Sequence, residues 1–329
     1  MEYNSIENYK LKYLKYKSKY LKLKYGGNND KRLYFIATHN NRLTCFFTKI
    51  LGEESKKFKN CTVIRCYFVN KVLHFEMIYE GELDQSEAKD PSKYWTITDF
   101  NNKKITMSKG LVNITGKAVD MNFGDFSNFK FDGNVEIYLV RHGKGVHNGA
   151  EGSDKFVLDR NKFFDAELVD IGKNQAKKAA GELVKFLETK FKNISLNMFF
   201  GASHLKRTRQ TIGTFIGILG EKILKAKLNK TIYIVPCVHE LAYSSDGNCD
   251  GSLFAGLELG KENSPKCGSP ESIHKQKECS AERYCTKEIC ENVTYNVHWD
   301  YYLHFYGNKQ RCRDVNFIWL ILHLFADKN

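Results

Sequence analysis

The sequence predicts an α/β fold, in which short apolar strands alternate with amphipathic helices around a mostly parallel sheet. The clearest strand is 135–140, VEIYLV, which is almost entirely apolar or β-branched. Comparable runs occur at 33–37 and 231–235. Residues 168–187 instead repeat alanines and leucines with the 3.6-residue period of a helix packed on one face. Strands that alternate with such helices are typical of α/β domains.

Length and composition indicate a folded protein with a substantial core. The 329 residues allow one large or two ordinary domains, and 42% of them are apolar and 27% charged. No apolar run is long enough to span a bilayer and no signal peptide is visible, so we expect a cytoplasmic protein with reduced thiols at its ten cysteines. The net charge of +13 suits an anionic substrate, but it also fits nucleic acid or a membrane surface.

Residues 1–27 form a basic leader. Its tyrosines and leucines recur at three- and four-residue spacings with lysines between them, which predicts a basic amphipathic helix ending at Gly26-Gly27. The leader resembles the lysine- and tyrosine-rich N-terminal leaders of many proteins of large DNA viruses. A helix that rests on the domain in solvent is the simpler interpretation, and a tether for an anionic partner is the alternative.

The strongest chemical feature is the stretch 135–148, VEIYLVRHGKGVHN, in which a strand runs into Arg141-His142-Gly143. Ligands of open α/β sheets bind at the carboxyl ends of the strands. Arginine offers a planar fork of donors to a phosphate, and histidine offers a nitrogen that can be neutral and nucleophilic near pH 7. Asn148 adds a neutral donor nearby. A histidine with a purely structural role at the strand end is the alternative.

This stretch resembles the signature of the histidine phosphatase, or phosphoglycerate mutase-like, superfamily, in which the histidine of the triplet becomes phosphorylated. The likeness continues after the strand at 196–200, where Ser203, Leu205 and Arg207 match the family's Ser-x-Leu-x-Arg. The segment 172–176, GKNQA, is similar to the family's second helix. The resemblance implies a three-layer α/β/α fold with a mostly parallel central sheet.

The family's second catalytic histidine follows a strand late in the chain, but here its counterpart precedes the Arg-His-Gly strand. Strand 33–37 leads into Thr38-His39-Asn40, and a helix at 42–51 and strands at 58–68 and 73–79 follow. Joining residue 329 to residue 31 would restore the family order, so we interpret the protein as a circularly permuted histidine phosphatase. A truncated, inactive phosphatase with an incidental His39 is the competing interpretation.

The permutation divides the chain into four parts. Residues 1–27 are the leader, 31–82 the permuted C-terminal part of the phosphatase domain, 83–133 a connector, and 134–329 the main part. Within the connector, 94–97 and 112–115 read as short strands.

An insertion at 243–292 holds five cysteines and one histidine. It contains no Cys-x-x-Cys pair, so zinc is the weaker interpretation and we expect no metal or cofactor.

The resemblance implies a metal-independent phosphomonoester hydrolase that works through a phosphohistidine on His142. Arg141, Arg207, His39 and Asn148 would bind the phosphate, together with Ser203 and with Asn40, which replaces the family's usual glycine. Glu240, just past strand 231–235, matches the proton donor of the mutase-like branch. A mutase-type phosphotransferase and a catalytically inactive phosphate-binding module are the alternatives. The identity of the small phosphorylated substrate and the oligomeric state are open.

Overall fold

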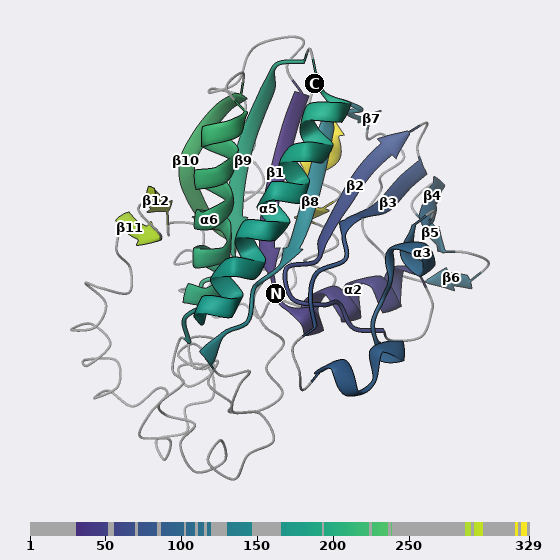
Figure 1. Cartoon of the computed structure of the whole chain (residues 1–329). Coiled ribbons are helices and arrows are strands. Elements are labelled where there is room, and N and C mark those ends of the chain that lie inside the picture. The colour runs from purple at the N-terminus through teal and green to yellow at the C-terminus, as the bar shows by residue number, and fades with distance from the viewer. Residues whose placement is uncertain are drawn as a thin grey trace, which may run out of the picture.

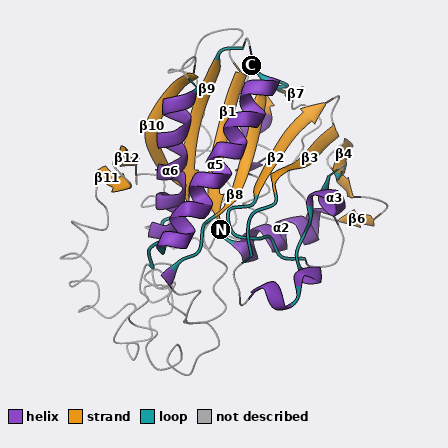
Figure 2. Ribbon diagram, viewed as in Figure 1, coloured by secondary structure: helices purple, strands orange, loops and turns teal. Residues whose placement is uncertain are grey.

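The protein is built on a large mixed β-sheet with helices on both faces (Figure 1 and Figure 2). The computed structural model describes residues 31–51, 56–69, 72–83, 87–101, 103–108, 111–114, 117–119, 130–146, 166–192, 194–223, 226–235, 238, 287–290, 293–298, 320–321 and 324–327. Among these residues no helix is both long and apolar enough to cross a membrane. The predicted α/β class is confirmed.

The middle of the sheet is parallel and its flanks are antiparallel. Across the sheet the strands are β11 (Lys287–Cys290), β12 (Val293–His298), β10 (Ala226–Ile234), β9 (Leu196–Ala202), β1 (Lys31–Thr38), β8 (Val135–Arg141), β2 (Val63–Val69), β3 (Val72–Tyr79), β4 (Lys104–Ser108), β5 (Leu111–Ile114) and β6 (Lys117–Val119). All pairs from β12 to β8 are parallel. The pair of β11 with β12 and every pair from β8 to β6 are antiparallel.

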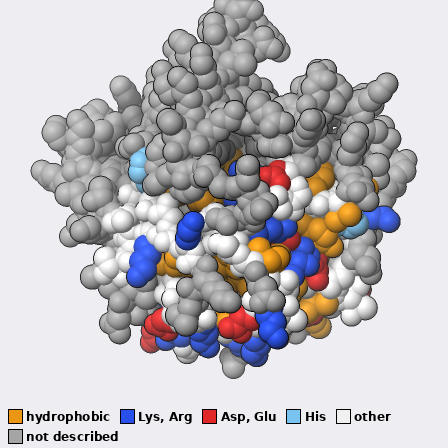
Figure 3. All heavy atoms as spheres, turned by 90° about the horizontal axis from the view of Figure 1, so that it is seen from above, with side chains coloured by type: hydrophobic (Ala, Val, Ile, Leu, Met, Phe, Trp, Pro, Cys, Tyr) orange, Lys and Arg blue, Asp and Glu red, His pale blue; other side chains and the backbone are white. Residues whose placement is uncertain are grey.

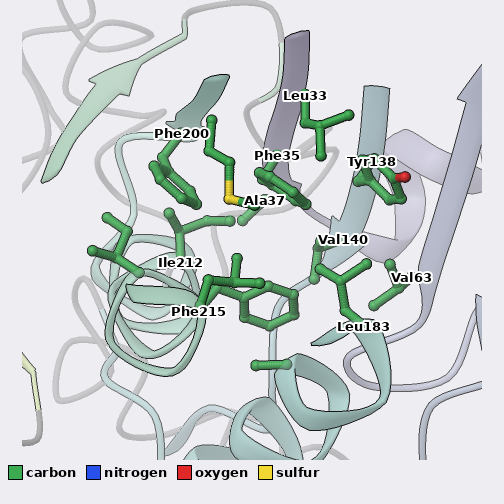
Figure 4. Packing of buried hydrophobic residues seen from close by; sticks show 14 of the residues in the cluster. Leu33, Phe35, Ala37, Val63, Tyr138, Val140, Leu183, Phe200, Ile212 and Phe215 are labelled. Carbon is green, nitrogen blue, oxygen red and sulfur yellow. The ribbon is translucent and has the colours of Figure 1, made fainter. Parts of the chain in front are cut away.

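Alternation along the central strands directs side chains into two separate cores. Helices α5 (Asp170–Lys190) and α6 (Lys206–Lys222) cover one face, where they pack on Leu33, Phe35 and Ala37 of β1 (Figure 4). Helix α2 (Asn40–Leu51) covers the other face and packs on Tyr34 and Ile36. Because both faces are covered, every residue of β8 is buried, which explains why its sequence is apolar apart from Glu136, Tyr138 and the final Arg141.

The segment 83–133 contributes to the sheet as well as connecting its parts, because β4, β5 and β6 extend the sheet beyond β3. The strand predicted at 94–97 is wrong. Short 3-10 turns, η1 (Glu87–Lys89) and η2 (Pro91–Lys93), precede it, and helix α3 (Ile97–Phe100) begins there. The cause is local, since the Thr96 side chain accepts a hydrogen bond from the Asp99 amide and caps the helix.

The strand predicted from residue 58 begins only at Val63. Cys61 has a φ of 59°, in the left-handed region, and the Thr62 amide bonds back to the Lys59 carbonyl at 3.1 Å. Residues 59–62 therefore form a turn, and the extended backbone starts after it.

Asp132 lies between the start of β1 and the last described segment of the chain. Its carboxylate pairs with Arg32, and its amide donates to the carbonyl of Phe325 at 2.8 Å. Next to it, β7 (Lys130–Phe131) pairs with β13 (Ala326–Asp327) in a separate two-stranded sheet. Residues 31–32 and 325–327 therefore border the same short piece of chain.

Charge is mixed on the face seen from the end of the sheet where the parallel strands begin. On the described part of that face, Lys and Arg side chains alternate with Asp and Glu (Figure 3). The described part of this face therefore shows no single basic patch.

Candidate active site

The carboxyl ends of β1, β8 and β9 lie side by side, at the lower end of the sheet in Figure 1. β1 pairs in parallel with both neighbours, so Thr38 stands opposite Arg141 and Ala37 opposite Ala202. The residues that directly follow include His39 and Ser203, and His142 follows Arg141. Three segments that are distant in the sequence thus deliver their polar residues to one edge, as expected for a ligand site of a parallel sheet.

His39 and His142 face each other across this edge. Their ring centroids are 5.0 Å apart, with an angle of 63° between the ring planes. Arg207, in the first turn of α6, contacts both: its Nε lies 3.2 Å from His142 Nε2, and its Nη2 lies 3.4 Å from His39 Nδ1. All three side chains are buried. The structure thus brings these three predicted site residues together.

The hydrogen bonds of His142 define its protonation. Its Nδ1 lies 2.7 Å from the carbonyl oxygen of Gly143, which can only accept, so Nδ1 carries the proton. Its Nε2 faces the Nε–H of Arg207, which can only donate, so Nε2 carries a lone pair. The imidazole is therefore neutral, with its nucleophilic nitrogen turned towards Arg207 and His39.

His39 is held by Ser203. Because the Arg207 guanidinium can only donate to His39 Nδ1, the proton of His39 lies on Nε2, which donates to Ser203 Oγ at 2.7 Å. Ser203 Oγ also accepts from the Leu205 amide at 3.3 Å and lies 2.9 Å from Thr208 Oγ1. These contacts use the one proton and two lone pairs of the hydroxyl. Ser203 therefore orients His39, and its predicted contact with phosphate stays a prediction.

Arg141 and Asn40 meet at the backbone of Phe58. The Asn40 Oδ1 atom accepts from the Phe58 amide at 2.9 Å, while Arg141 Nη1 donates to the Phe58 carbonyl. Arg141 is buried directly before His142, where a phosphate ligand was predicted. Asn40 instead fixes residues 56–60 to the start of α2, so the side-chain oxygen of this predicted phosphate ligand binds the protein.

Two helices hold the backbone that follows His142. The Gly143 amide donates to Thr211 Oγ1 of α6 at 3.1 Å, and the Lys144 amide donates to Gln175 Oε1 of α5 at 2.9 Å. Gly172 packs against this loop so closely that a Cβ there would overlap the Lys144 carbonyl. The spacing within 172–176 was visible in the sequence, but the contact with the loop depends on how α5 lies on the sheet.

Gly172→Ala is therefore expected to displace the loop and lower any turnover at the site by about 100-fold, since misplacement by 1 Å costs on that order. Gly181→Ala is the matched control: it lies in the same helix, no atom lies within 4 Å of its added Cβ, and alanine there should stabilise by about 0.5–1 kcal/mol. Steady-state kinetics measure the turnover of both variants, and urea unfolding measures their stability. Equal kinetics in the two variants would contradict the role of the close packing.

Two predicted site residues, Asn148 and Glu240, lie outside the described residues, as do the leader and most of the insertion at 243–292. The nearest described neighbour of Glu240 in the sequence is Val238, whose carbonyl accepts a hydrogen bond from Thr38 Oγ1 at 2.7 Å. Because Thr38 directly precedes His39, the chain after β10 returns to the edge that carries the two histidines.

The electrostatic setting of the site is basic. Arg141 and Arg207 are both buried, and the only buried carboxylate among the described residues is that of Glu136, which pairs with Arg65. Within the same residues, no group of three or more His, Cys, Asp or Glu side chains could hold a metal ion. The described part of the site thus favours an anion over a cation.

In comparisons with known proteins, no family model, no curated protein and no solved structure matches this chain.

Proposed function

We propose that the protein is a phosphomonoester hydrolase of the histidine phosphatase type that works through a phosphohistidine on His142. The observation that carries this proposal is the protonation pattern of His142, whose Nδ1 donates to the Gly143 carbonyl and whose Nε2 offers a lone pair beside Arg207. A buried neutral imidazole with one nitrogen fixed as a donor leaves the other available as a nucleophile. A histidine with a purely structural role would not require an arginine that donates to its unprotonated nitrogen, as Arg207 does to Nε2 of His142.

In the first step, Nε2 of His142 attacks phosphorus and the bond from phosphorus to the ester oxygen breaks. The Arg207 guanidinium transfers its hydrogen bond from Nε2 to a phosphoryl oxygen, and Arg141 neutralises charge on the remaining oxygens, which is where electrostatic stabilisation acts. His39 joins them as a phosphate ligand through Nδ1 when it is protonated on both ring nitrogens. Glu240 and Asn148 enter through the family resemblance: the carboxylic acid of Glu240 gives its proton to the leaving alcohol, and the Asn148 amide binds phosphate.

In the second step, water attacks the phosphoenzyme. The bond from phosphorus to Nε2 breaks, the Glu240 carboxylate takes a proton from the water, and inorganic phosphate leaves. His142 returns to the neutral state in which Nδ1 is protonated. Each residue ends the cycle as it began, as hydrolysis requires.

The permuted phosphoglycerate mutase-like fold is part of the same proposal. In the sheet, β1 lies between β8 and β9. In the sequence, however, β1 precedes both, and β9 is the next long parallel strand after β8. Arg32 and Phe325 both contact Asp132, so a short link from residue 327 to residue 31 would reconnect the fold in the order of the family. These features support one domain that contains both histidines over a truncated domain beside an incidental His39.

The experiment is an assay of the purified full-length protein on p-nitrophenyl phosphate, with and without EDTA. We expect turnover that EDTA does not alter, and a loss of about four orders of magnitude or more in kcat/KM for His142→Ala, as for other covalent nucleophiles. Acid-labile, base-stable phosphate should be trapped on the wild-type protein and not on this variant.

His74→Ala serves as the control, because His74 lies on β3, away from His39, His142 and Arg207. Its ring stacks on Tyr67, with the ring centroids 5.2 Å apart. It should keep wild-type turnover. If the wild type and His142→Ala are equally silent while both bind inorganic phosphate, the protein is a binding module and the hydrolase proposal fails.

A further inference from the structure

A closed ring of four hydrogen bonds connects the proposed nucleophile to α6. Arg207 Nε donates to His142 Nε2 at 3.2 Å, and His142 Nδ1 donates to the Gly143 carbonyl at 2.7 Å. The Gly143 amide donates to Thr211 Oγ1 at 3.1 Å, and Thr211 Oγ1 donates to the Arg207 carbonyl at 2.8 Å. Both nitrogens of the imidazole are thus members of one ring that closes at a threonine.

We propose that Thr211 is a positioning residue for the proposed hydrolysis, because it fixes the tautomer and the direction of His142 through the Gly143 backbone. This inference rests on the proposed function only for its kinetic consequence. The tautomer of His142 is a property of the folded protein, whatever reaction the site performs.

The direction of every bond in the ring is determined. The Thr211 hydroxyl has one proton, which it gives to the Arg207 carbonyl one turn earlier in the helix, so it can only accept from Gly143. A threonine side chain in a helix that bonds to a carbonyl of the preceding turn is held in one rotamer. Thr211 therefore presents a fixed acceptor to the loop.

Two peptide units flank Gly143, and each is anchored separately. Thr211 holds the unit between His142 and Gly143, through the Gly143 amide. Gln175 Oε1 holds the next unit, through the Lys144 amide at 2.9 Å, and the carbonyl of that unit accepts the proton on His142 Nδ1. Thr211, Gln175 and the loop contacts are all buried or half-buried, so water replaces them poorly.

Loss of the Thr211 acceptor would loosen the first unit, which would then keep only the 3.4 Å bond from the Cys61 amide to the His142 carbonyl. The Gly143 Cα, which both units share, could then shift and draw the Gly143 carbonyl away from Nδ1. The imidazole could then place its proton on Nε2, where it would block attack on phosphorus. Partners that orient a functional histidine in this way are worth about 10- to 100-fold when removed. We expect this loss in kcat, with a much smaller change in KM, because Arg141 is not part of the ring.

The test compares Thr211→Val with Thr211→Ser and Thr214→Val in the full-length protein. Valine keeps the shape of threonine and removes the hydroxyl, whereas serine restores the hydroxyl. Thr214 is the matched control, since it lies on the same buried face of α6 and donates to the Gln210 carbonyl at 3.0 Å, four residues earlier, as Thr211 does to Arg207.

Two measurements are made on each variant: kinetics on p-nitrophenyl phosphate, and the ¹⁵N shifts of the His142 imidazole, assigned with His142→Gln. Thr211→Val should lower kcat by about 10- to 100-fold and move the ¹⁵N shifts towards a mixture of tautomers. Thr211→Ser should recover most of the rate, and Thr214→Val should match the wild type in both measurements.

Wild-type rate and wild-type ¹⁵N shifts in Thr211→Val would overturn the proposal. If the wild-type protein shows no turnover, the hydrolase proposal fails, and the ¹⁵N shifts alone still decide the role of Thr211. If Thr211→Val does not fold, Thr211→Ala carries the same test, because it removes the same acceptor with a smaller side chain; unchanged ¹⁵N shifts there would equally overturn the proposal.

Discussion

Replacement of Arg207 by lysine is expected to lower kcat/KM on an aryl phosphate by about 10³-fold or more, the range found for arginines that stabilise a transferring phosphoryl group. The guanidinium reaches His142 Nε2 with Nε and His39 Nδ1 with Nη2, and its side chain is fully buried. A lysine ammonium is a single point of charge that cannot serve two positions with fixed geometry, so the conservative change is not conservative here.

Arg32→Lys is the matched control for Arg207→Lys. Arg32 pairs with Asp132 near the start of β1, at the opposite end of that strand from His39, and its side chain is partly exposed. Its replacement should leave the kinetics unchanged. A loss of less than ten-fold in Arg207→Lys, with the fold intact by circular dichroism, would remove Arg207 from the proposed mechanism.

Arg65→Met is expected to lower the free energy of unfolding by about 3–5 kcal/mol, the cost of leaving a buried charge without its partner. Arg65 binds both carboxylate oxygens of Glu136 at 2.7 Å, and its third contact, to Glu76, is 2.6 Å. Glu136 is 2% exposed, and Lys31 would remain as its only described cationic partner, at 3.1 Å. Urea unfolding measures the loss.

Two further variants separate the buried charge from general damage. Arg65→Met combined with Glu136→Met removes both charges and should recover much of the lost stability, since a well-packed apolar pair often replaces a buried ion pair without loss. Lys173→Met removes the partner of the exposed Asp170 and should have almost no effect. A double variant as unstable as the single one would show that packing, rather than the unpaired carboxylate, causes the loss.

The pH dependence of stability follows from Glu136. Burial by itself raises the pKa of Glu136, but the hydrogen bonds and charge of Arg65, with Lys31 and Tyr138, outweigh burial and place the pKa below its usual value. The folded-state pKa is thus lower than the unfolded value of about 4.3. The stabilisation is therefore present above about pH 4.3 and is lost as the pH falls through the folded-state pKa. In Arg65→Met this acid dependence should weaken or change sign, because burial then dominates.

The sequence predicted the elements whose pattern is set by the sheet and its two layers of helices. β1, β8, β9 and β10 were found from their apolar runs, and α5 from its 3.6-residue period, because each is buried on a defined face. Local capping at Thr96 and the turn at Cys61 moved other boundaries, since a hydrophobic pattern does not report a backbone turn. In the segment that was interpreted as a connector, the strand predicted at 112–115 corresponds to β5, but β4 and β6 were missed because their polar surroundings lack a strong pattern.

The site was predictable as a set of residue types and less so as a set of contacts. His39 and His142 could be named from their positions after strands, and Arg207 from the likeness of residues 203–207 to the Ser-x-Leu-x-Arg motif. Their meeting depends on β1 lying between β8 and β9. The supporting contacts of Ser203 and Thr211 required the position of α6 on the sheet, which the sequence does not express. A serine and a threonine near an arginine look equally suited to phosphate or to protein.

The place of β1 at the centre of the sheet has a consequence during synthesis. Its partners β8 and β9 follow about 100 and about 160 residues later, so at about 5–20 residues per second the ribosome needs on the order of ten seconds or more to supply both. Until then, a strongly apolar segment has two open hydrogen-bonding edges, the condition under which strands pair with other chains. The strand that leads into His39 is thus translated early but gains its hydrogen-bonding partners late. We therefore expect the nascent chain to need protection of this strand from other chains until β8 and β9 have been made.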